Sequence, residues 1–323
     1  MTSVAATPEL IGIVSRVTRA VPGWDEAIAE GKRGGYRVFD AIGVGMTLAD
    51  LPLDVARELV GVVISTEPCT ADVLERLPAL RAVSCIGTGL DHVDLDATAA
   101  RGIDVTSGLG ANAEAVADHT LAMLLYLVRG LGVAREVVLS GHGWDSWPPV
   151  IPRDLKEITV GIIGLGNIGR AVAARISAFG STVVYHDPYL ASPPPDVTAA
   201  SQRSLDQLLD DADVVTIHVP LTDETRGLLG EAEIRRLKRG AIVLNLSRGG
   251  ILDERAAFAA LEEGHLGGVG LDVFEQEGRG APAPPEHPRF VASPHMGGIS
   301  DRIARETRVA AVKRLLASLD APQ

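Results

Sequence analysis

Apolar residues along this chain gather in short runs that alternate with stretches of helical periodicity. The runs predict β-strands, because a strand buried on both faces of a parallel sheet is apolar throughout. Between several of them, apolar side chains recur at helical spacing, as in residues 71–77 and 95–101. Strands that alternate with helices indicate parallel sheets with crossover helices. The strands predicted in the first third of the chain are residues 10–14, 36–41, 59–65, 82–86 and 103–106.

A long helical pattern then runs from residue 112 to about residue 140. Its middle, residues 121–128, is apolar nearly all round, so we expect it to be buried between layers or in a subunit interface. This stretch is too short to span a membrane. A loop rich in Trp, Gly and Pro is expected at residues 141–152.

The same alternation continues to the end of the chain. Strands are predicted at residues 158–163, 182–185, 214–219, 241–246, 268–273 and 290–292. Helices are predicted at residues 167–179, 204–210, 231–238, 253–262 and 300–319, and loops at residues 192–197 and 278–288.

A glycine motif follows directly on the apolar run of residues 158–163, and a second apolar run ends at Asp187. In this order the motif is the dinucleotide-binding fingerprint: Gly164 permits a tight turn, Gly166 lets the backbone approach a pyrophosphate, and Gly169 lets helix and strand pack closely. Asp187 would accept a hydrogen bond from a ribose 2′-hydroxyl and would repel a 2′-phosphate, which favours NAD over NADP. The predicted cofactor-binding residues of this segment are Gly164, Gly166, Asn167, Ile168, Gly169 and Asp187.

Composition narrows the class of protein. The 323 residues suggest about two domains, and 46% hydrophobic with 22% charged residues are typical of a globular protein. The net charge of −12 argues against nucleic acid as a partner, because phosphate binding needs a basic surface. The two cysteines show no disulfide or zinc pattern, and the first residues show no signal peptide. We therefore expect a soluble cytoplasmic protein with no membrane partner and no metal.

Three polar groups follow predicted strands, where an open α/β sheet binds its ligands. Arg248 could bind a carboxylate with its planar fork. An acidic segment from Asp272 to Glu277 follows the next strand, and His295 lies between a proline and two glycines. Histidine is the usual general acid or base near neutral pH. Taken alone, each of these could equally be a surface residue in a turn or a loop.

The order of the motifs resembles that of the D-isomer-specific 2-hydroxyacid dehydrogenase family, and the resemblance covers nearly the whole chain. The downstream motifs are the glycine fingerprint, His218-Val-Pro-Leu-Thr, Asn245-Leu-Ser-Arg-Gly-Gly, Leu271-Asp-Val-Phe-Glu-x-Glu and Ser293-Pro-His-Met-Gly-Gly. The upstream motifs are Cys85-Ile-Gly-Thr-Gly-Leu-Asp-His-Val-Asp and Ala113-Glu-Ala-Val-Ala-Asp-His-Thr.

The resemblance implies a catalytic set of Arg248, Glu277 and His295. It departs from the family at Gly278, where members usually have proline, and in a shorter stretch before His295, so Glu275 is an alternative partner for the histidine. The resemblance also assigns Asp272 to the nicotinamide region. Further cofactor-binding positions are Val219, Pro220, Leu246, Ser247 and Gly297, and the loop expected to hold the substrate carboxylate, together with Arg248, is Gly87, Thr88 and Gly89.

The family fold implies two α/β domains, Rossmann-like or flavodoxin-like, with parallel sheets around a central cleft. The substrate (catalytic) domain would be discontinuous, residues 1–108 and 296–323, and the NAD-binding Rossmann domain would be residues 109–295. A homodimer is expected from the family, with residues 121–128 as the candidate interface.

The function implied is reversible hydride transfer between nicotinamide C4 and C2 of a small D-2-hydroxy acid or 2-keto acid, with His295 exchanging the proton. Glyoxylate, hydroxypyruvate and 3-phosphohydroxypyruvate all remain open as substrates. One alternative is a dehydrogenase of another small anion, phosphite or formate, although the formate branch usually has Gln in place of Glu277. Another alternative is an NAD(H)-sensing binding protein like the family's transcriptional corepressors.

Overall fold

The chain divides into two compact units, and each has its own parallel sheet. The computed structural model describes residues 7–43, 45–141, 151–190, 192, 194–197, 200–277 and 280–321. The first unit joins Met1–Asn112 to Ile299–Gln323, and the second is Ala113–Gly298. Two units with parallel sheets are the fold class expected from the alternating pattern.

The first unit contains a five-stranded parallel sheet in the order β2-β1-β3-β4-β5. β1, β3 and β4 are buried at every position, as their continuous apolar runs predict. The strands are β1 (Leu10–Ser15), β2 (Arg37–Ile42), β3 (Leu59–Ile64), β4 (Ala82–Cys85) and β5 (Asp104–Thr106).

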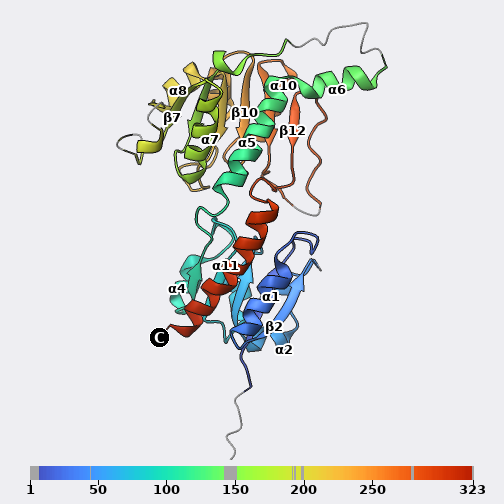
Figure 1. The fold of residues 1–323 in the computed structure, drawn as a ribbon, viewed down its shortest axis with the longest axis vertical. Helices are drawn as coiled ribbons and strands as arrows, with labels where there is room; N and C mark the ends of the chain where they lie inside the picture. The colour runs from blue at the N-terminus through green and yellow to red at the C-terminus, as the bar shows by residue number, and fades with distance from the viewer. Residues whose placement is uncertain are drawn as a thin grey trace, which may run out of the picture. The chain divides into compact units, whose positions relative to one another are not determined.

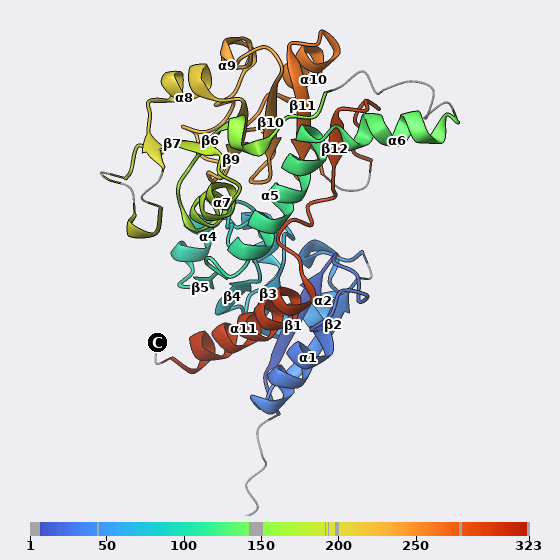
Figure 2. The same cartoon turned by 45° about the horizontal axis from the view of Figure 1, so that its top comes forward.

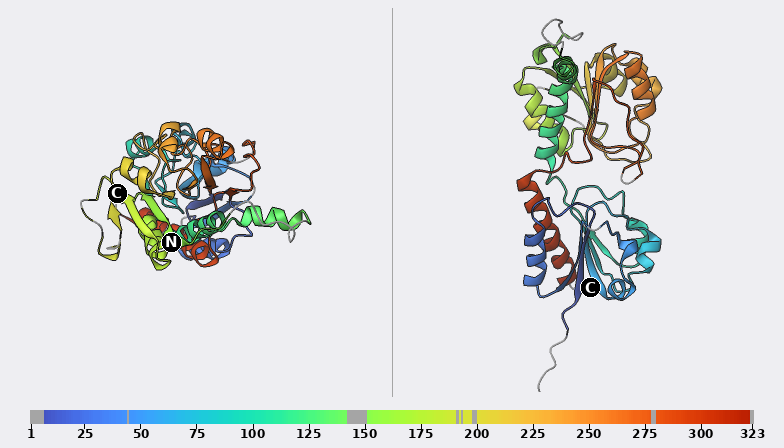
Figure 3. Two further views of the ribbon diagram at one scale, coloured as in Figure 1. Left: turned by 90° about the horizontal axis from the view of Figure 1, so that it is seen from above. Right: turned by 90° about the vertical axis from the view of Figure 1, so that its right-hand side faces the viewer.

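Helices cover both faces of this sheet (Figure 3). α1 (Trp24–Arg33) and α11 (Asp301–Asp320) pack on the face that Ile11 and Ile13 enter. α2 (Leu53–Glu58) and α3 (Ala71–Glu75) pack on the other face, against the alternate side chains of β1. α4 (Leu95–Ala100) joins the second layer through Ala97. The C-terminal helix therefore completes a core that begins at the N-terminus.

The second unit contains a seven-stranded parallel sheet in the order β12-β11-β10-β9-β6-β7-β8. The strands are β6 (Thr159–Ile163), β7 (Thr182–His186), β8 (Ser201–Gln202), β9 (Val214–Ile217), β10 (Ala241–Asn245), β11 (Leu266–Leu271) and β12 (Phe290–Ala292). One face carries α5 (Ala113–Val128) and α7 (Asn167–Ala178), as Figure 1 shows. The opposite face carries α8 (Leu205–Asp211), α9 (Glu231–Arg236) and α10 (Glu254–Glu262).

The prediction of a single long helix over residues 112–140 is wrong, because two helices occupy this stretch. Gly130 adopts a left-handed φ of 62°, which ends α5 and starts α6 (Leu131–Leu139). In residues 121–128, Met123, Leu124, Leu127 and Val128 are buried in the core of the second unit. α6 extends away from the rest of that unit (Figure 2). The exposed apolar side chains of this region are instead Leu131, Val138 and Leu139 on α6.

Other predicted bounds agree with the observed elements to within a few residues, and three α-helices and strands are additional. α1, α2 and β8 lie in stretches where no helix or strand had been specified. Residues 142–150 of the predicted loop 141–152, and residues 278–279 of the predicted loop 278–288, lie outside the described residues. The loop predicted at residues 192–197 contains a 3₁₀ turn at Pro195–Val197. No helix in the described part of the chain is long and apolar enough to cross a bilayer.

A buried carboxylate joins two strand ends in the first unit. Glu67 is fully buried just after β3, and its Oε1 accepts the backbone N–H of Arg16, after β1, at 2.6 Å. Its Oε2 accepts the N–H of Ser65, also at 2.6 Å. These two bonds pair a carboxylate that is itself removed from water, and they hold together the loops at the carboxyl edge of the sheet.

Glu67→Ala is expected to lower the free energy of unfolding by about 2 kcal/mol, because two backbone N–H groups lose their charged acceptor. Glu67→Gln keeps one acceptor oxygen and should lose less. The measurement is the urea unfolding curve of the whole chain. Glu58→Ala is the control, since it breaks only the exposed pair with Arg37 and should change little. Equal stability of Glu67→Ala and the wild type would contradict this role.

Candidate functional site

The turn after β6 has the shape that its three glycines predict. Gly164 has a left-handed φ of 89°, and a Cβ there would lie 2.6 Å from a methyl carbon of Val219. A Cβ on Gly169 would lie 2.1 Å from the carbonyl oxygen of Gly164, so α7 can only approach the turn this closely without a side chain there. A Cβ on Gly166 would meet nothing within 4 Å. The backbone at Gly166 is therefore open to a ligand.

The start of α7 suits an anion. The N-cap residue of this helix is Gly166, which makes no side-chain hydrogen bond to the first turn. The first backbone N–H groups of the helix, including those of Asn167 and Ile168, are therefore not capped by Gly166. Asp187 follows β7, and its carboxylate accepts the N–H of Leu165 at 2.9 Å and that of Tyr189 at 3.0 Å. The acidic residue thus holds the glycine turn itself. Together these residues fit the pyrophosphate and ribose of a dinucleotide.

The next strand end, after β9, carries His218, Val219 and Pro220. His218 is buried with its Nε2 2.9 Å from Thr216 Oγ1. Burial lowers the pKa of the His218 ring to about 3, so this histidine is neutral. It therefore adds no positive charge beside the glycine turn.

The buried side chain of Asn245 shapes the loop that carries Arg248. Its Nδ2 donates to the Arg248 carbonyl at 2.8 Å, and its Oδ1 accepts the N–H and the hydroxyl of Ser247 at 3.1 and 2.8 Å. The following Gly249 lies against the next loop, since a Cβ there would be 2.0 Å from the carbonyl oxygen of Phe274. The loops after β10 and β11 are thus in close contact.

His295 pairs with Glu277. Its Nδ1 lies 2.8 Å from Glu277 Oε2, and the other carboxylate oxygen accepts the N–H of Phe274 at 3.1 Å. Among the described residues the Glu275 carboxylate makes no hydrogen bond or ion pair with His295, and its backbone N–H donates to Glu254 at 2.5 Å. An ionised carboxylate can only accept, so Nδ1 carries the hydrogen and Nε2 is the ring atom left to exchange a proton.

The charge around Glu277 favours its ionised form. Burial pushes the pKa of this carboxyl group up, but the hydrogen bond and the charge of His295 push it down. The Phe274 N–H and Arg248 act in the same direction, and the pKa is lowered overall. Of the predicted catalytic residues, the structure thus brings His295 and Glu277 into contact and places Arg248 within electrostatic range of Glu277.

The backbone of His295 is held in an uncommon conformation. Its φ is 51°, the one positive value among the described non-glycine residues. Its N–H donates to the Asp272 carbonyl at 2.8 Å. The Asp272 side chain accepts from the N–H of Met296 at 2.9 Å and of Gly297 at 2.8 Å. A Cβ on Gly297 would lie 2.7 Å from that carboxylate, so glycine is required for the approach.

Two polar side chains complete the surroundings of Asp272, and the sequence pattern did not connect them to the site. Ser293 Oγ lies 2.5 Å from Asp272 Oδ1, and His119 Nε2 lies 2.7 Å from Ser293 Oγ. Both residues lie inside motifs that carry the family resemblance, but no spacing pairs them, because His119 is on α5, far upstream of Ser293. Contacts across that separation require the fold.

The loop that is predicted to bind the substrate carboxylate, residues 87–89, belongs to the first unit and follows β4. Thr88 Oγ1 donates to the Gly108 carbonyl at 3.2 Å, which fixes the loop. Within the described residues, the N–H groups of Gly87, Thr88 and Gly89 donate to no other protein group. They are free to bind a carboxylate.

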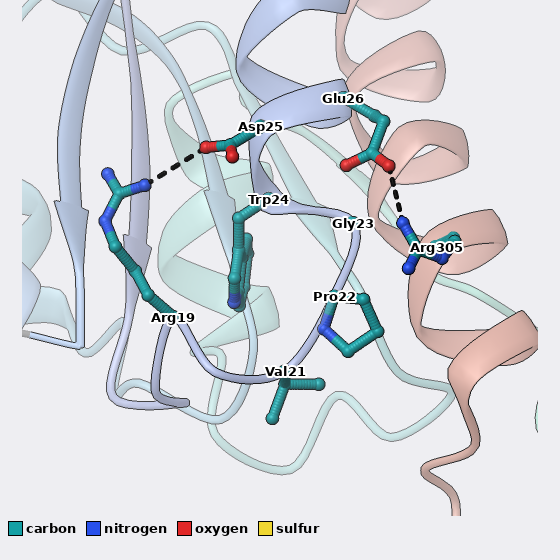
Figure 4. A pocket seen from close by; sticks show the side chains of 8 residues that line it. All are labelled: Arg19, Val21, Pro22, Gly23, Trp24, Asp25, Glu26 and Arg305. Carbon is teal, nitrogen blue, oxygen red and sulfur yellow. Dashed lines mark hydrogen bonds and ion pairs between the residues drawn. The ribbon is translucent and has the colours of Figure 1, made fainter.

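A pocket in the first unit lies beside the start of α1 and contains none of the predicted site residues (Figure 4). Its arginines are paired with acids: Arg19 lies 3.3 Å from Asp25, and Arg305 lies 2.7 Å from Glu26. The pocket therefore offers no unpaired charge to an anionic substrate.

Comparison with known proteins points to one family. The model described as "D-isomer specific 2-hydroxyacid dehydrogenase, NAD binding domain" matches residues 121–297. A glyoxylate reductase of Korarchaeum cryptofilum (strain OPF8) is 38% identical over 242 residues, which are 73% of this chain and 72% of that protein.

Two further relatives extend the comparison. A D-3-phosphoglycerate dehydrogenase of Bacillus subtilis (strain 168) is 36% identical over 239 residues, 72% of this chain but 44% of that enzyme. The matched region therefore spans less than half of that relative. The solved structure of a D-lactate dehydrogenase from Aquifex aeolicus, complexed with NAD and lactic acid, is 26% identical with a TM-score of 0.86, and 95% of each chain is covered.

Two substitutions in the glycine turn should separate ligand binding from folding. Gly166→Ala places a methyl group in open space at a φ of −71°, so stability should hold. Affinity for NADH should fall about tenfold, or roughly 1.4 kcal/mol, because the methyl group blocks the pyrophosphate. Gly169→Ala should cost about 2 kcal/mol of stability through overpacking. The measurements are NADH fluorescence titration and thermal unfolding, and the reverse pattern would contradict the roles assigned here.

Proposed function

The chain belongs to the D-isomer specific 2-hydroxyacid dehydrogenase family, and we propose that it reduces a small 2-keto acid to the D-2-hydroxy acid with NADH. The observation that carries this proposal is the His295–Glu277 pair, at 2.8 Å. Because Nδ1 is paired with Glu277, Nε2 of His295 is the ring atom that can donate a proton. His295 and the glycine turn after β6 both lie at the carboxyl edge of the sheet of the second unit. Family membership confirms the predicted fold class, the NAD cofactor and the dehydrogenase class.

The proposed reaction balances with the residues present. When bound, NADH supplies a hydride to C2 of the keto acid. His295 Nε2 gives its proton to the keto oxygen, so the products are NAD⁺ and the hydroxy acid, and the reverse reaction returns the proton to neutral His295. Glu277 stabilises the imidazolium form and orients the ring through Nδ1.

The carboxylate of the substrate needs donors, and two groups are proposed for it. Arg248 has a planar fork that can bind a carboxylate with two hydrogen bonds and also polarise the keto oxygen. The free N–H groups of Gly87, Thr88 and Gly89 suit the same anion. We assign the first unit to the substrate and the second unit, which contains the matched residues 121–297, to NAD.

The NAD contacts are proposed on the geometry of the second unit. The glycine turn and the start of α7 would hold the pyrophosphate. Asp187 would bind the ribose and disfavour NADP, while Val219, Pro220, Leu246 and Ser247 flank the same edge of the sheet. Asp272 and Gly297 would lie near the nicotinamide.

Glyoxylate and hydroxypyruvate are the proposed substrates. The relatives with most of their length matched are named glyoxylate reductases, whereas the matched phosphoglycerate dehydrogenase is covered only to 44%. Formate and phosphite dehydrogenation are alternatives, and Glu277 at the acidic position counts against formate. An NAD(H)-sensing binding protein is the alternative outside enzymes.

A homodimer is also proposed, with its interface on α6. Much of the apolar surface of residues 121–128 is buried in the core of the second unit. Leu131, Val138 and Leu139 on α6 are 51%, 60% and 66% exposed, so this helix has apolar side chains that are free to meet a second copy.

A panel of 2-keto acids, followed by loss of NADH absorbance, tests the function. We expect turnover with glyoxylate or hydroxypyruvate. His295→Ala should lower kcat/KM roughly 10²- to 10⁴-fold, because the proton donor is lost. NADH binding by His295→Ala is the control. Tight NADH binding with no turnover of any keto acid would favour a binding protein instead.

Glu277→Gln should change the pH dependence of reduction. Reduction needs the imidazolium form of His295, and the lowered pKa of Glu277 keeps its carboxylate charged into the acid range. The contribution of the Glu277 carboxylate to kcat/KM is therefore present above that pKa and is lost as pH falls through it. Glu277→Gln has no carboxyl group to titrate, so kcat/KM should be lower above that pKa, and the acid fall caused by protonation of Glu277 should be absent from its profile. An unchanged profile would contradict the pairing, and Glu275→Gln is the matched control.

A further inference from the structure

His119 lies on α5 and faces the loop that carries His295. Its Nε2 is 2.7 Å from Ser293 Oγ and 3.8 Å from Asp272 Oδ1. Ser293 Oγ is 2.5 Å from the same Asp272 oxygen. The three side chains form one line of hydrogen bonds that begins at a helix and ends at the carboxyl end of β11.

The number of hydrogens sets the direction of these bonds. Ser293 has one hydroxyl hydrogen, and an ionised Asp272 can only accept. The hydroxyl therefore donates to Asp272, and its oxygen accepts from His119 Nε2. Both the neutral ring with its hydrogen on Nε2 and the imidazolium can donate there, so the hydrogen bond does not require a charged ring.

The line continues beyond Asp272. The same carboxylate accepts the N–H of Met296 and of Gly297, the two residues that follow His295. Asp272 is only 2% exposed, so its charge depends on these donors for stabilisation. Loss of one donor would leave the carboxylate free to turn, and the two backbone N–H groups would move with it.

We infer that His119 is a positioning residue, which acts through Ser293 and Asp272 to hold the backbone of His295. The φ of 51° at His295 costs energy in a non-glycine residue and needs a lasting restraint. The inference rests on the proposed function, in which His295 donates the proton. His119 itself neither exchanges a proton with substrate nor contacts it.

The test compares His119→Ala with His119→Gln in the whole chain. His119→Ala removes the donor, and kcat for keto-acid reduction should fall about tenfold because the proton donor is misplaced. His119→Gln keeps an N–H donor that does not titrate, so it should recover most of kcat and reproduce the wild-type pH profile. Loss of a limb of that profile in His119→Gln would make His119 a proton carrier and overturn the inference, as would equal impairment of the two variants.

Ser293→Ala supplies the second arm. If His119 acts through Ser293, adding His119→Ala to Ser293→Ala should cause no further loss of kcat, and additive losses would overturn the inference. If His119→Ala does not fold, His119→Gln and Ser293→Ala alone decide the question: an undiminished kcat in Ser293→Ala, or a lost limb of the pH profile in His119→Gln, would overturn the inference.

His295→Ala in the same assay separates this inference from the proposed function. Undiminished turnover by His295→Ala would contradict the proposed function. Undiminished turnover by His119→Ala, with His295→Ala inactive, would contradict only the positioning role. Thermal unfolding and NADH binding of each variant show that the comparison is between folded proteins.

Discussion

The arrangement around His295 depends on the buried carboxylate of Asp272. A charge taken out of water is tolerated only when hydrogen-bond donors stabilise it, and Asp272 accepts from Ser293, Met296 and Gly297. These partners leave the carboxylate one orientation. Because two of them are backbone groups, the orientation of a side chain at the end of β11 sets the path of the chain after His295.

The same edge of the sheet brings the remaining groups of the second unit together. All strands of this sheet run parallel, so the turns after β6, β9, β10 and β11 emerge at one edge. Glycines then allow the close approaches: Gly169 against Gly164, and Gly249 against Phe274. Residues that are distant in sequence, and for which cofactor-binding and catalytic roles are proposed, thus come to lie along one edge.

Errors in the predicted elements came from local patterns read without their surroundings. Apolar periodicity continues through residue 130, so it predicted one helix, but the left-handed Gly130 divides it into α5 and α6. Residues 121–128 were expected to be buried, and half of them are, in the core of their own unit. The exposed apolar side chains lie on α6 rather than in residues 121–128. A helix that extends away from its unit has no neighbouring layer to pack against.

The sequence by itself determined the parallel α/β class, the glycine turn with Asp187 and the dehydrogenase family, because each depends on local spacing or on motifs in order. Only the tertiary structure decided that Glu277, rather than Glu275, contacts His295, since both lie in one acidic loop. It also decided that His119 meets Ser293. Those contacts follow from how α5 packs on the sheet and how the loops after β11 and β12 fold back, and sequence spacing carries no record of either distance.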